Sequence, residues 1–410
     1  MSNTPSASSN LLEILGVSGR EDVITNLLAH CYNNSNVFRC SFLRSLGVPL
    51  DGAGSPSGTA YTRVLTGDVG VPDIVIVNPD GAGRNIVVIE NKLGAIEGED
   101  QTQRYSSPDC LKHLATRFSF DVKTVEPHYV FLTLFPDERP ASPKFVPVSY
   151  EALLQQEWTF GAGDGSWVAE LTRAWLDLLA RFYQTGRLRA TDILLERLRE
   201  NDPLEGSFLA FRSFMHSVPC PPGLSYLGSW RSSQAGRRYY LAQFGKGTWQ
   251  PSEMDQSGQT WRLDSETCFN IHIEPQFNVL SGKFSIFLHY ETNPYVPQKA
   301  ARSSLGRGDF DAYGMQRGRF VSVFRTVCPS DCAVGVGWNQ IAKATLSLDG
   351  LSVEASFRRF GDLFRRISKA VDKTLQQIRS APENRGAAHS ASYVRTVRSP
   401  IGEDRGKGDT

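Results

Sequence analysis

The stretch GVPDIVIVNPDGAGRNIVVIENK, from Gly70 to Lys92, decides the fold of the N-terminal half of this chain. It contains two runs of valine and isoleucine separated by a segment rich in Gly, Asn, Asp and Pro. This pattern is typical of two buried strands joined by a hairpin loop. Three charged residues, Asp73, Glu90 and Lys92, interrupt the apolar runs. Because charged side chains are costly to bury, their presence in core-like strands needs a physical explanation.

Strand geometry places the three charged side chains together. Side chains alternate between the two faces of a strand, so Asp73 shares a face with Val77, and Glu90 and Lys92 share a face with Ile86. If Val77 pairs with Ile86 in antiparallel register, Asp73 lies opposite Glu90. Opposed carboxylates destabilise a sheet, and a half-buried pair needs a cation between its members or a proton on one of them. Mg²⁺, which binds carboxylate, water and phosphate oxygens, is the simplest such cation.

The composition excludes several classes of protein. The chain has 410 residues, enough for two or three domains, and its net charge of +1 provides no overall basic field. We expect a cytoplasmic protein without membrane attachment, because MSNTPSASSN is polar and no stretch approaches the ~18 apolar residues of a membrane helix. The seven cysteines include no Cys-x-x-Cys pair, which predicts reduced thiols. The histidines are scattered, and none joins a nucleophile motif of a protease or esterase.

Hydrophobic periodicity predicts a first domain over residues 11–200. Residues 1–10 are polar and are expected to be disordered. The order of the expected elements is helix, strand group, helix, strand and further helices, which suits an α/β domain. Helices are expected over 11–46, near Glu99, and over 167–184 and 191–200, and strands over 61–66, 71–77, 86–92 and 128–136.

A change in composition predicts a second, α+β domain over residues 201–380. The segment VPCPPG, residues 218–223, has the chemistry of a linker or turn. Strand patterns occur in YYLAQF, CFNIHI, KFSIFLHY, FVSVFRTV and KATLSL, and a long helix is expected over 357–379. We expect this domain to select a substrate, a partner or an oligomeric state. Residues 381–410 are rich in Gly, Ser and Arg and are expected to be disordered.

Three short motifs of the first domain follow one another in a recognisable order, each in a fitting strand or helix context. They are Gly-x-x-Asp from Gly70 to Asp73, Glu-x-Lys from Glu90 to Lys92, and Gln-x-x-x-Tyr from Gln101 to Tyr105. Together they resemble the PD-(D/E)XK nuclease superfamily, and the last is similar to the branch that includes exonuclease domains of recombination and repair helicases. The stretch VVIENKLGAIEGEDQTQRY also resembles bacterial members of unassigned role. The resemblance covers about residues 15–135, and it implies a restriction-endonuclease-like core, a mixed central sheet flanked by helices.

The resemblance implies a metal-dependent nuclease that hydrolyses DNA phosphodiester bonds with Mg²⁺, for which Mn²⁺ can substitute. Asp73 and Glu90 would hold the metal together with the backbone carbonyl of Asn91. The family often has a further metal-binding Glu on a helix ahead of the sheet, and Glu21 fits that place. Its neighbour Asp22 is the alternative, and both also suit a helix N-terminus for purely local reasons.

The remaining motif residues would act on the phosphate and the attacking water. Lys92 would contact the scissile phosphate and orient or activate the water. Gln101 and Tyr105 would position phosphate or water from their helix. Each of these residues also has an ordinary explanation, since Gln101 and Tyr105 are simply neighbours at i,i+4.

Two alternatives to a deoxyribonuclease stay open. One is a catalytically inactive nuclease fold that binds nucleic acid or a protein partner, and the other is an RNA or structure-specific nuclease. Cleavage that depends on a divalent metal, compared over DNA and RNA substrates, separates them. By the habit of the family, the role would be restriction or bacterial anti-phage defence, with a homo-oligomer or a defence-system protein as partner.

The helix expected over 357–379 offers a second nucleic-acid-binding candidate. Its apolar residues recur on one face, and basic residues lie on another. Such a basic face could bind phosphates, and a solvated helix face is the alternative. The basic residues are Arg358, Arg365, Lys369 and Lys373.

Overall fold

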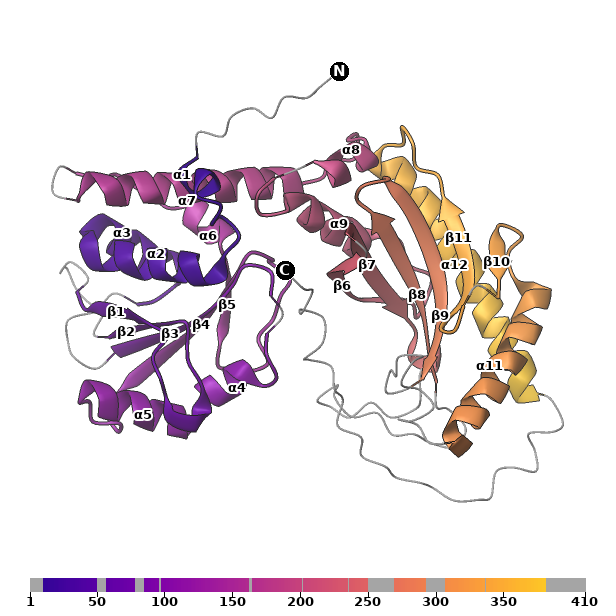
Figure 1. Ribbon diagram of the computed structural model, residues 1–410, viewed down its shortest axis with the longest axis horizontal. Helices are drawn as coiled ribbons and strands as arrows, with labels where there is room; N and C mark the ends of the chain where they lie inside the picture. Colours follow the sequence, from indigo (N-terminus) through magenta and orange to yellow (C-terminus); the bar gives the residue numbers. More distant parts are fainter. Residues whose placement is uncertain are drawn as a thin grey trace. The chain divides into compact units, whose positions relative to one another are not determined.

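The computed structural model describes residues 10–49, 57–77, 85–95, 97–161, 164–200, 202–234, 236–249, 269–292, 307–335 and 337–380 (Figure 1). The chain divides into two compact units. The first comprises Met1–Gln184 and Asn201–Gly206, and the second comprises Thr185–Glu200 and Ser207–Thr410.

The first domain was expected to end at residue 200, but residues 185–200 belong to the second unit and residues 201–206 belong to the first. Helix α8 (Leu194–Arg199) belongs to the second unit. Ile193, just before it, forms an isolated β-bridge with Ser352, and the Leu194 N–H donates to the Leu351 carbonyl at 3.2 Å. The VPCPPG segment is a turn inside the second unit, between α9 (Gly206–Ser217) and β6 (Ser225–Gln234).

The two segments expected to be disordered lie outside the described residues, with one exception. Asn10 is ordered, because its side chain accepts a hydrogen bond from the Leu12 N–H at 3.0 Å and so caps α1 (Leu11–Ile14). The cysteines that the structure describes carry free thiols, as expected, and Cys268 lies outside the described residues. None of the described helices combines the length and the apolar character needed to cross a membrane.

The first unit contains one sheet and its covering helices. The helical pattern over 11–46 forms three helices, because Gly16 and Ser35 interrupt it. The strands are β1 (Thr59–Thr62), β2 (Ile74–Val77), β3 (Asn85–Lys92), β4 (Glu126–Thr133) and β5 (Val146–Ser149). The helices after α1 are α2 (Glu21–Asn34), α3 (Asn36–Ser45), α4 (Gln101–Tyr105), α5 (Pro108–Phe118), α6 (Glu151–Leu154) and α7 (Ser166–Gly186), with a short 3₁₀ turn at Gly67–Val69.

The strands of this sheet follow the order β1-β2-β3-β4-β5. The first three pair antiparallel, whereas β3, β4 and β5 pair parallel. Val77 lies opposite Ile86 and Ile74 opposite Ile89, which confirms the expected register of the hairpin strands. Parallel strands require a crossover connection, and α4 and α5 form it between β3 and β4. The predicted mixed sheet flanked by helices is therefore present.

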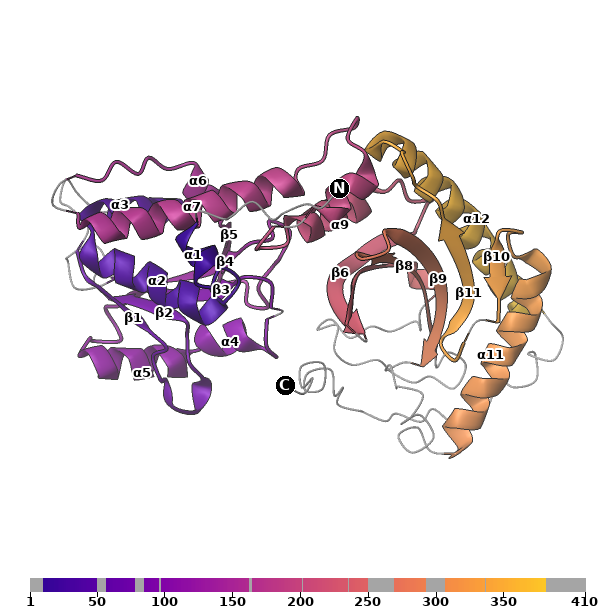
Figure 2. The same ribbon diagram turned by 45° about the horizontal axis from the view of Figure 1, so that its top comes forward.

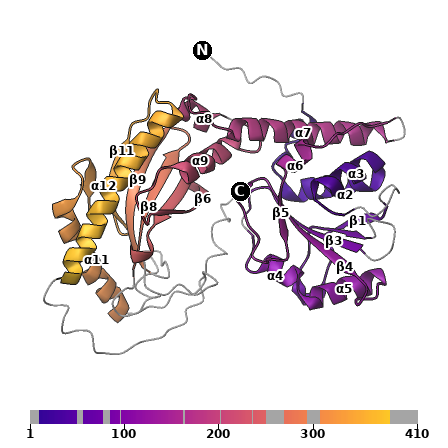
Figure 3. The same ribbon diagram turned by 180° about the vertical axis from the view of Figure 1, so that it is seen from behind.

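Helices cover both faces of the sheet, so β3 is buried along its whole length. Figures 1 and 3 show α2 and α3 on one face and α4 and α5 on the other. The face toward α5 buries Val75 and Val88 of the strands against Tyr105 of α4 and Leu114 of α5. Alternating side chains of β2 and β3 thus enter two separate apolar layers, as strand geometry requires.

The second unit is built on an antiparallel sheet with the order β10-β11-β9-β8-β7-β6. Figure 2 shows this sheet strongly curved, with α9 and α12 along its convex side. The further strands are β7 (Arg237–Gly245), β8 (Phe269–Asn278), β9 (Lys283–Thr292), β10 (Cys332–Val334) and β11 (Gln340–Leu346), and the further helices are α11 (Arg307–Val327) and α12 (Val353–Ser380), with a 3₁₀ turn at Gly247–Trp249.

Aromatic side chains form the core between the sheet and α12. The rings of Phe244 and Phe364 lie 4.7 Å apart, and those of Phe284 and Phe360 lie 5.2 Å apart. The long helix begins four residues before the expected start, because Ser352 accepts a hydrogen bond from the Ala355 N–H and ends the preceding turn.

One predicted strand is wrong. FVSVFRTV, residues 320–327, is the last part of helix α11. Its apolar residues fit a period of two, but Phe320 and Phe324 are four apart and both are buried. Phe320 packs on Tyr290 of β9. The tertiary contacts therefore favour the helical period over the alternating one.

Candidate active site

The charged residues Asp73, Glu90 and Lys92 meet at one end of the central strands, where β2 begins and β3 ends. Glu90 and Lys92 belong to β3, and Asp73 immediately precedes β2. Oδ2 of Asp73 accepts a hydrogen bond from the Asn91 N–H at 2.8 Å, and Nζ of Lys92 forms an ion pair with Oε1 of Glu90. The structure therefore brings together the three residues that strand alternation placed on one face.

Glu21, the first residue of α2, joins this cluster from the other side of the hairpin strands. Its Oε2 accepts a hydrogen bond from the Leu93 N–H at 2.9 Å, and its Oε1 lies 3.7 Å from Nζ of Lys92. Asp22 points elsewhere and pairs with Arg20 at 3.0 Å. Of the two adjacent candidates, Glu21 is the one that reaches the cluster.

Glu90 is the most constrained residue of the site. Its side chain is 0% exposed, and its Oε1 forms an ion pair with the Lys92 ammonium. Burial, together with the nearby Asp73, raises the pKa of Glu90 to about 8, although Lys92 acts in the opposite direction. A buried carboxylate is unstable as an anion unless nearby positive charge offsets its desolvation, and Lys92 offsets it only in part because the pKa stays raised.

The other charged groups respond to the same environment. Burial is the main cause that raises the pKa of Asp73 and of Glu21. Burial by itself would lower the pKa of Lys92, but the carboxylates of Glu90 and Glu21 outweigh it and the pKa is raised overall. The Lys92 ammonium therefore stays charged at neutral pH.

The donor set suits a hard divalent cation. Glu21, Asp73 and Glu90 supply carboxylate oxygens around the Lys92 ammonium, and oxygen ligands of this kind bind Mg²⁺. These residues are the ones that would hold it.

The side chain of Asn91 lies on the opposite face of β3. Its Nδ2 donates to Oγ1 of Thr25 at 2.8 Å, and its Oδ1 accepts from the Tyr150 hydroxyl at 2.7 Å. A part in metal binding would therefore fall to its backbone carbonyl, as expected. Thr25 and Tyr150 had no sequence signal, because α2 and the segment after β5 reach Asn91 only in the folded chain.

Gln101 and Tyr105 hold the loop that carries Asp73. The Tyr105 hydroxyl donates to the Val71 carbonyl at 3.1 Å and accepts hydrogen bonds from the Val71 N–H and from Nε2 of Gln101, both at 3.2 Å. Oε1 of Gln101 accepts a hydrogen bond from the Gly98 N–H at 3.1 Å. In this arrangement the motif acts on protein backbone, which differs from the expected contact with phosphate or water.

Glu97 is a residue of this region that the sequence analysis missed. Its Oε1 accepts hydrogen bonds from the Thr102 N–H at 2.7 Å and from the Thr102 hydroxyl, and its Oε2 accepts one from the Ala141 N–H at 2.8 Å. Glu97 therefore satisfies a free backbone N–H in the first turn of α4 and links this helix to the loop after β4. An acidic residue just before a helix was the available signal.

The basic face of α12 carries acidic partners. All four predicted residues, Arg358, Arg365, Lys369 and Lys373, are exposed. Arg358 pairs with Glu354 at 3.0 Å, and Arg365 pairs with Asp362 at 3.5 Å. Interspersed charges of both signs are typical of a solvated helix face, which weakens the case for phosphate binding there.

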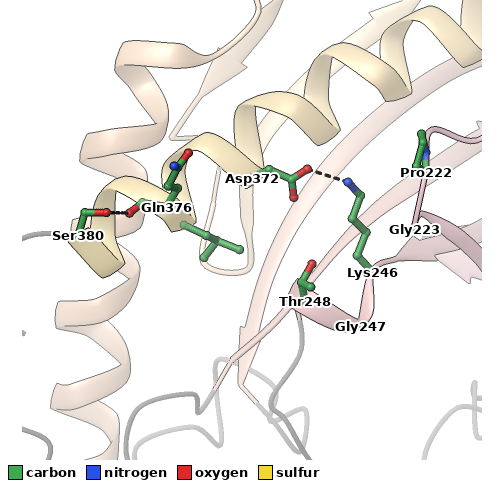
Figure 4. Close-up of a pocket in the computed structure, with 9 residues that line it drawn as sticks. Pro222, Gly223, Lys246, Gly247, Thr248, Asp372, Gln376 and Ser380 are labelled. Carbon is green, nitrogen blue, oxygen red and sulfur yellow. Dashed lines mark hydrogen bonds and ion pairs between the residues drawn. The ribbon is translucent and has the colours of Figure 1, made fainter.

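A pocket of about 660 Å³ lies in the second unit, where α12 passes the turn after β7 (Figure 4). Nζ of Lys246 donates to Oδ2 of Asp372 at 2.7 Å, and Oδ1 of Asp372 accepts from the Trp249 indole at 2.7 Å. These contacts satisfy the charged groups of the pocket, and none of the predicted site residues lines it.

The cluster of Glu21, Asp73, Glu90 and Lys92 is therefore the site with the clearest chemical character in the first unit. Glu90 and Lys92 are buried, and ion pairs of Lys92 with Glu90 and Glu21 hold the charged groups together. No protein-family model, curated protein or solved structure matches this chain.

Proposed function

We propose that this protein is a metal-dependent nuclease that hydrolyses DNA phosphodiester bonds, with Asp73, Glu90 and Lys92 as its catalytic residues and Glu21 as a further metal ligand. One observation carries the proposal. Glu90 is a fully buried carboxylate that pairs through Oε1 with the Lys92 ammonium, and the nearby carboxylate of Asp73 helps to keep its pKa raised. A protein interior tolerates such a group when a ligand completes it.

A bound Mg²⁺ would stabilise charge on the phosphoryl oxygens and lower the pKa of an attacking water. Glu21, Asp73 and Glu90 would hold the ion. Lys92 keeps its proton at neutral pH, because the neighbouring carboxylates raise its pKa. It would therefore act as a cation that contacts a phosphate oxygen and orients the water, not as a general base.

The order of elements agrees with this proposal. The mixed sheet with a helical crossover between β3 and β4 is the arrangement that the motif resemblance implies. Tyr105 and Gln101 would contribute by fixing the backbone at Val71, two residues before Asp73. Preorganised ligands of this kind are needed when catalysis depends on electrostatics.

The decisive experiment is incubation of the purified full-length protein with supercoiled plasmid, linear DNA and RNA, with Mg²⁺ and with EDTA. We expect DNA cleavage with Mg²⁺, none with EDTA, and none in E90Q. D22N, which changes the exposed neighbour of Glu21, is the matched control and should remain active. Cleavage that survives in E90Q would refute the proposal, and cleavage of RNA alone would reassign the substrate.

One observation favours a second candidate, an inactive nuclease fold that binds nucleic acid or a protein. The ion pair between Lys92 and Glu90 partly neutralises the cluster without any metal. In that case Mg²⁺ would neither bind at the cluster nor promote cleavage of any substrate. A calorimetric titration of the wild type and E90Q with Mg²⁺ distinguishes the two candidates.

A further inference from the structure

Two histidines face each other in the second unit. His272 of β8 and His289 of β9 are direct partners in the antiparallel register, so their side chains leave the same face of the sheet. Their rings are stacked, with centroids 4.8 Å apart. Glu274 and Glu291 lie two residues further along the two strands and therefore share that face.

The four side chains are close enough to form one polar cluster. Nδ1 of His289 lies 2.9 Å from Oε1 of Glu291, and its Nε2 lies 3.6 Å from Oε1 of Glu274. Nε2 of His272 lies 3.9 Å from Oε2 of Glu274. One ligand atom from each of His272, His289 and Glu291 can be chosen so that all three lie within 4.8 Å of one another.

The cluster is buried and poorly satisfied. His272 is 1% exposed and His289 is 6% exposed. Nδ1 of His272 and Nε2 of His289 have no hydrogen-bond partner within the described residues. A buried ring nitrogen without a partner costs free energy, and a bound metal ion would offset that cost.

Burial lowers the pKa of His272 well below its usual value, and the neighbouring His289 lowers it further. Burial also acts to lower the pKa of His289, but the carboxylates of Glu291 and Glu274 raise it overall. Burial therefore favours the neutral form of His272, which is the form that ligates metals, whereas the carboxylates favour the protonated form of His289.

We propose that His272, His289 and Glu291 bind a transition-metal ion of the Zn²⁺ class. Imidazole nitrogen and carboxylate oxygen together suit Zn²⁺, whereas Mg²⁺ selects oxygen ligands alone. Tetrahedral ligand atoms about 2.1 Å from Zn²⁺ lie about 3.4 Å apart, so the side chains need only small movements. Glu274 stands next to both rings as a fourth ligand or as an outer partner that orients them.

The burial of the site indicates what the ion does. Its ligands come from two neighbouring strands, and the rings have almost no exposed surface. A closed site of this kind cross-links β8 and β9 and stabilises the second unit, since a catalytic zinc site keeps an open position for water. The proposed nuclease site lies in the first unit and uses other residues, so either proposal can hold without the other.

The test uses the full-length protein, freed of metal with a chelator and titrated with Zn²⁺ in competition with a chromophoric chelator. We expect one ion per chain and an affinity that falls at least about 100-fold in the H272A/H289A double variant. H113A removes an exposed imidazole from α5 and should bind like the wild type. E90Q should also keep its zinc, which separates this site from the carboxylates of the first unit.

Two further measurements keep the proposal testable if the double variant does not fold. E291Q preserves the side-chain shape and should weaken zinc binding about 10-fold or more. Substitution with Co²⁺ should give the visible bands of a tetrahedral site without a thiolate charge-transfer band, because none of the described cysteines belongs to the cluster. Failure to bind one equivalent of zinc, a thiolate band, or equal affinity in wild type and E291Q would overturn the proposal.

Discussion

Tyr105 lies directly against the backbone of Gly70: a Cβ atom added at Gly70 would be 2.6 Å from Cε1 of the Tyr105 ring. Gly70 also has φ of +138°, which L side chains rarely adopt. The Gln-x-x-x-Tyr and Gly-x-x-Asp motifs are therefore in direct contact through Tyr105 and Gly70. Because the contact lies three residues before Asp73, it controls where that carboxylate points.

We predict that G70A lowers the free energy of unfolding by about 2 kcal/mol or more, because the backbone strain and the ring contact act together. Cleavage should fall as well, since Asp73 moves with the loop. Chemical denaturation and plasmid cleavage measure the two effects. G16A tests the role of strain alone, because Gly16 has φ of +66° and nothing within 4 Å of an added Cβ. Equal costs for both variants would argue against the contact.

Y105F should lower the free energy of unfolding by about 1–3 kcal/mol, because the hydroxyl satisfies both polar backbone groups of Val71. If Tyr105 acts only through the loop, Y105F raises the Mg²⁺ concentration needed for half-maximal cleavage and changes the rate at saturating Mg²⁺ much less. A large loss of rate at saturating Mg²⁺ with normal stability would instead place Tyr105 on the phosphate, as its sequence motif suggested.

K92M should reduce DNA cleavage by about 100-fold or more, because Lys92 supplies charge in the transition state. The fold should persist, but metal-free K92M should be less stable than the wild type above about pH 7. The reason is that Glu90 would lose the cation that favours its ionised form. K112M, at an exposed position on α5, is the control. Normal turnover in K92M would remove Lys92 from the mechanism.

The pKa of Glu90 predicts how stability depends on pH. The group binds its proton more tightly in the folded chain, with a pKa of about 8, than in the unfolded chain, with a pKa of 4.5. Its contribution is therefore fully present below pH 4.5 and is lost as the pH rises through about 8. Metal-free protein should lose stability over this range, and E90Q should lose less. Thermal unfolding from pH 5 to 9 measures this.

The same coupling predicts that Mg²⁺ stabilises the protein more at pH 8.5 than at pH 6, because binding requires the ionised form of Glu90. E21Q should raise the Mg²⁺ concentration for half-maximal stabilisation about 10-fold, whereas D22N should leave it unchanged. Equal effects of E21Q and D22N would mean that Glu21 only caps its helix.

The common face of Asp73, Glu90 and Lys92 was predictable because side chains alternate between the two faces of a strand. The pairing of Val77 with Ile86 was an assumption, since a slip of two residues keeps the same face, and the structure confirms it. The helix at 320–327 was not predictable in this way, since its apolar spacing fits both periods and the contact with Tyr290 decides between them.

The choice between Glu21 and Asp22 shows the limit of local reasoning. Both are acidic residues in the first turn of α2, and nothing in their neighbourhood distinguishes them. Only the packing of α2 on the sheet directs Glu21 toward Leu93, which is 72 residues away in the chain. The histidine pair is a similar case, because His272 and His289 belong to no motif and meet through strand pairing.

The sequence by itself determined the central strands and the face that carries the charged cluster, because alternation and turn chemistry act over a few residues. Only the tertiary structure decided that Tyr105 hydrogen-bonds to Val71, that Glu21 joins the cluster, and that His272 pairs with His289 across two strands. These contacts join residues separated by many positions. Their geometry depends on how whole helices and strands pack, which no local pattern encodes.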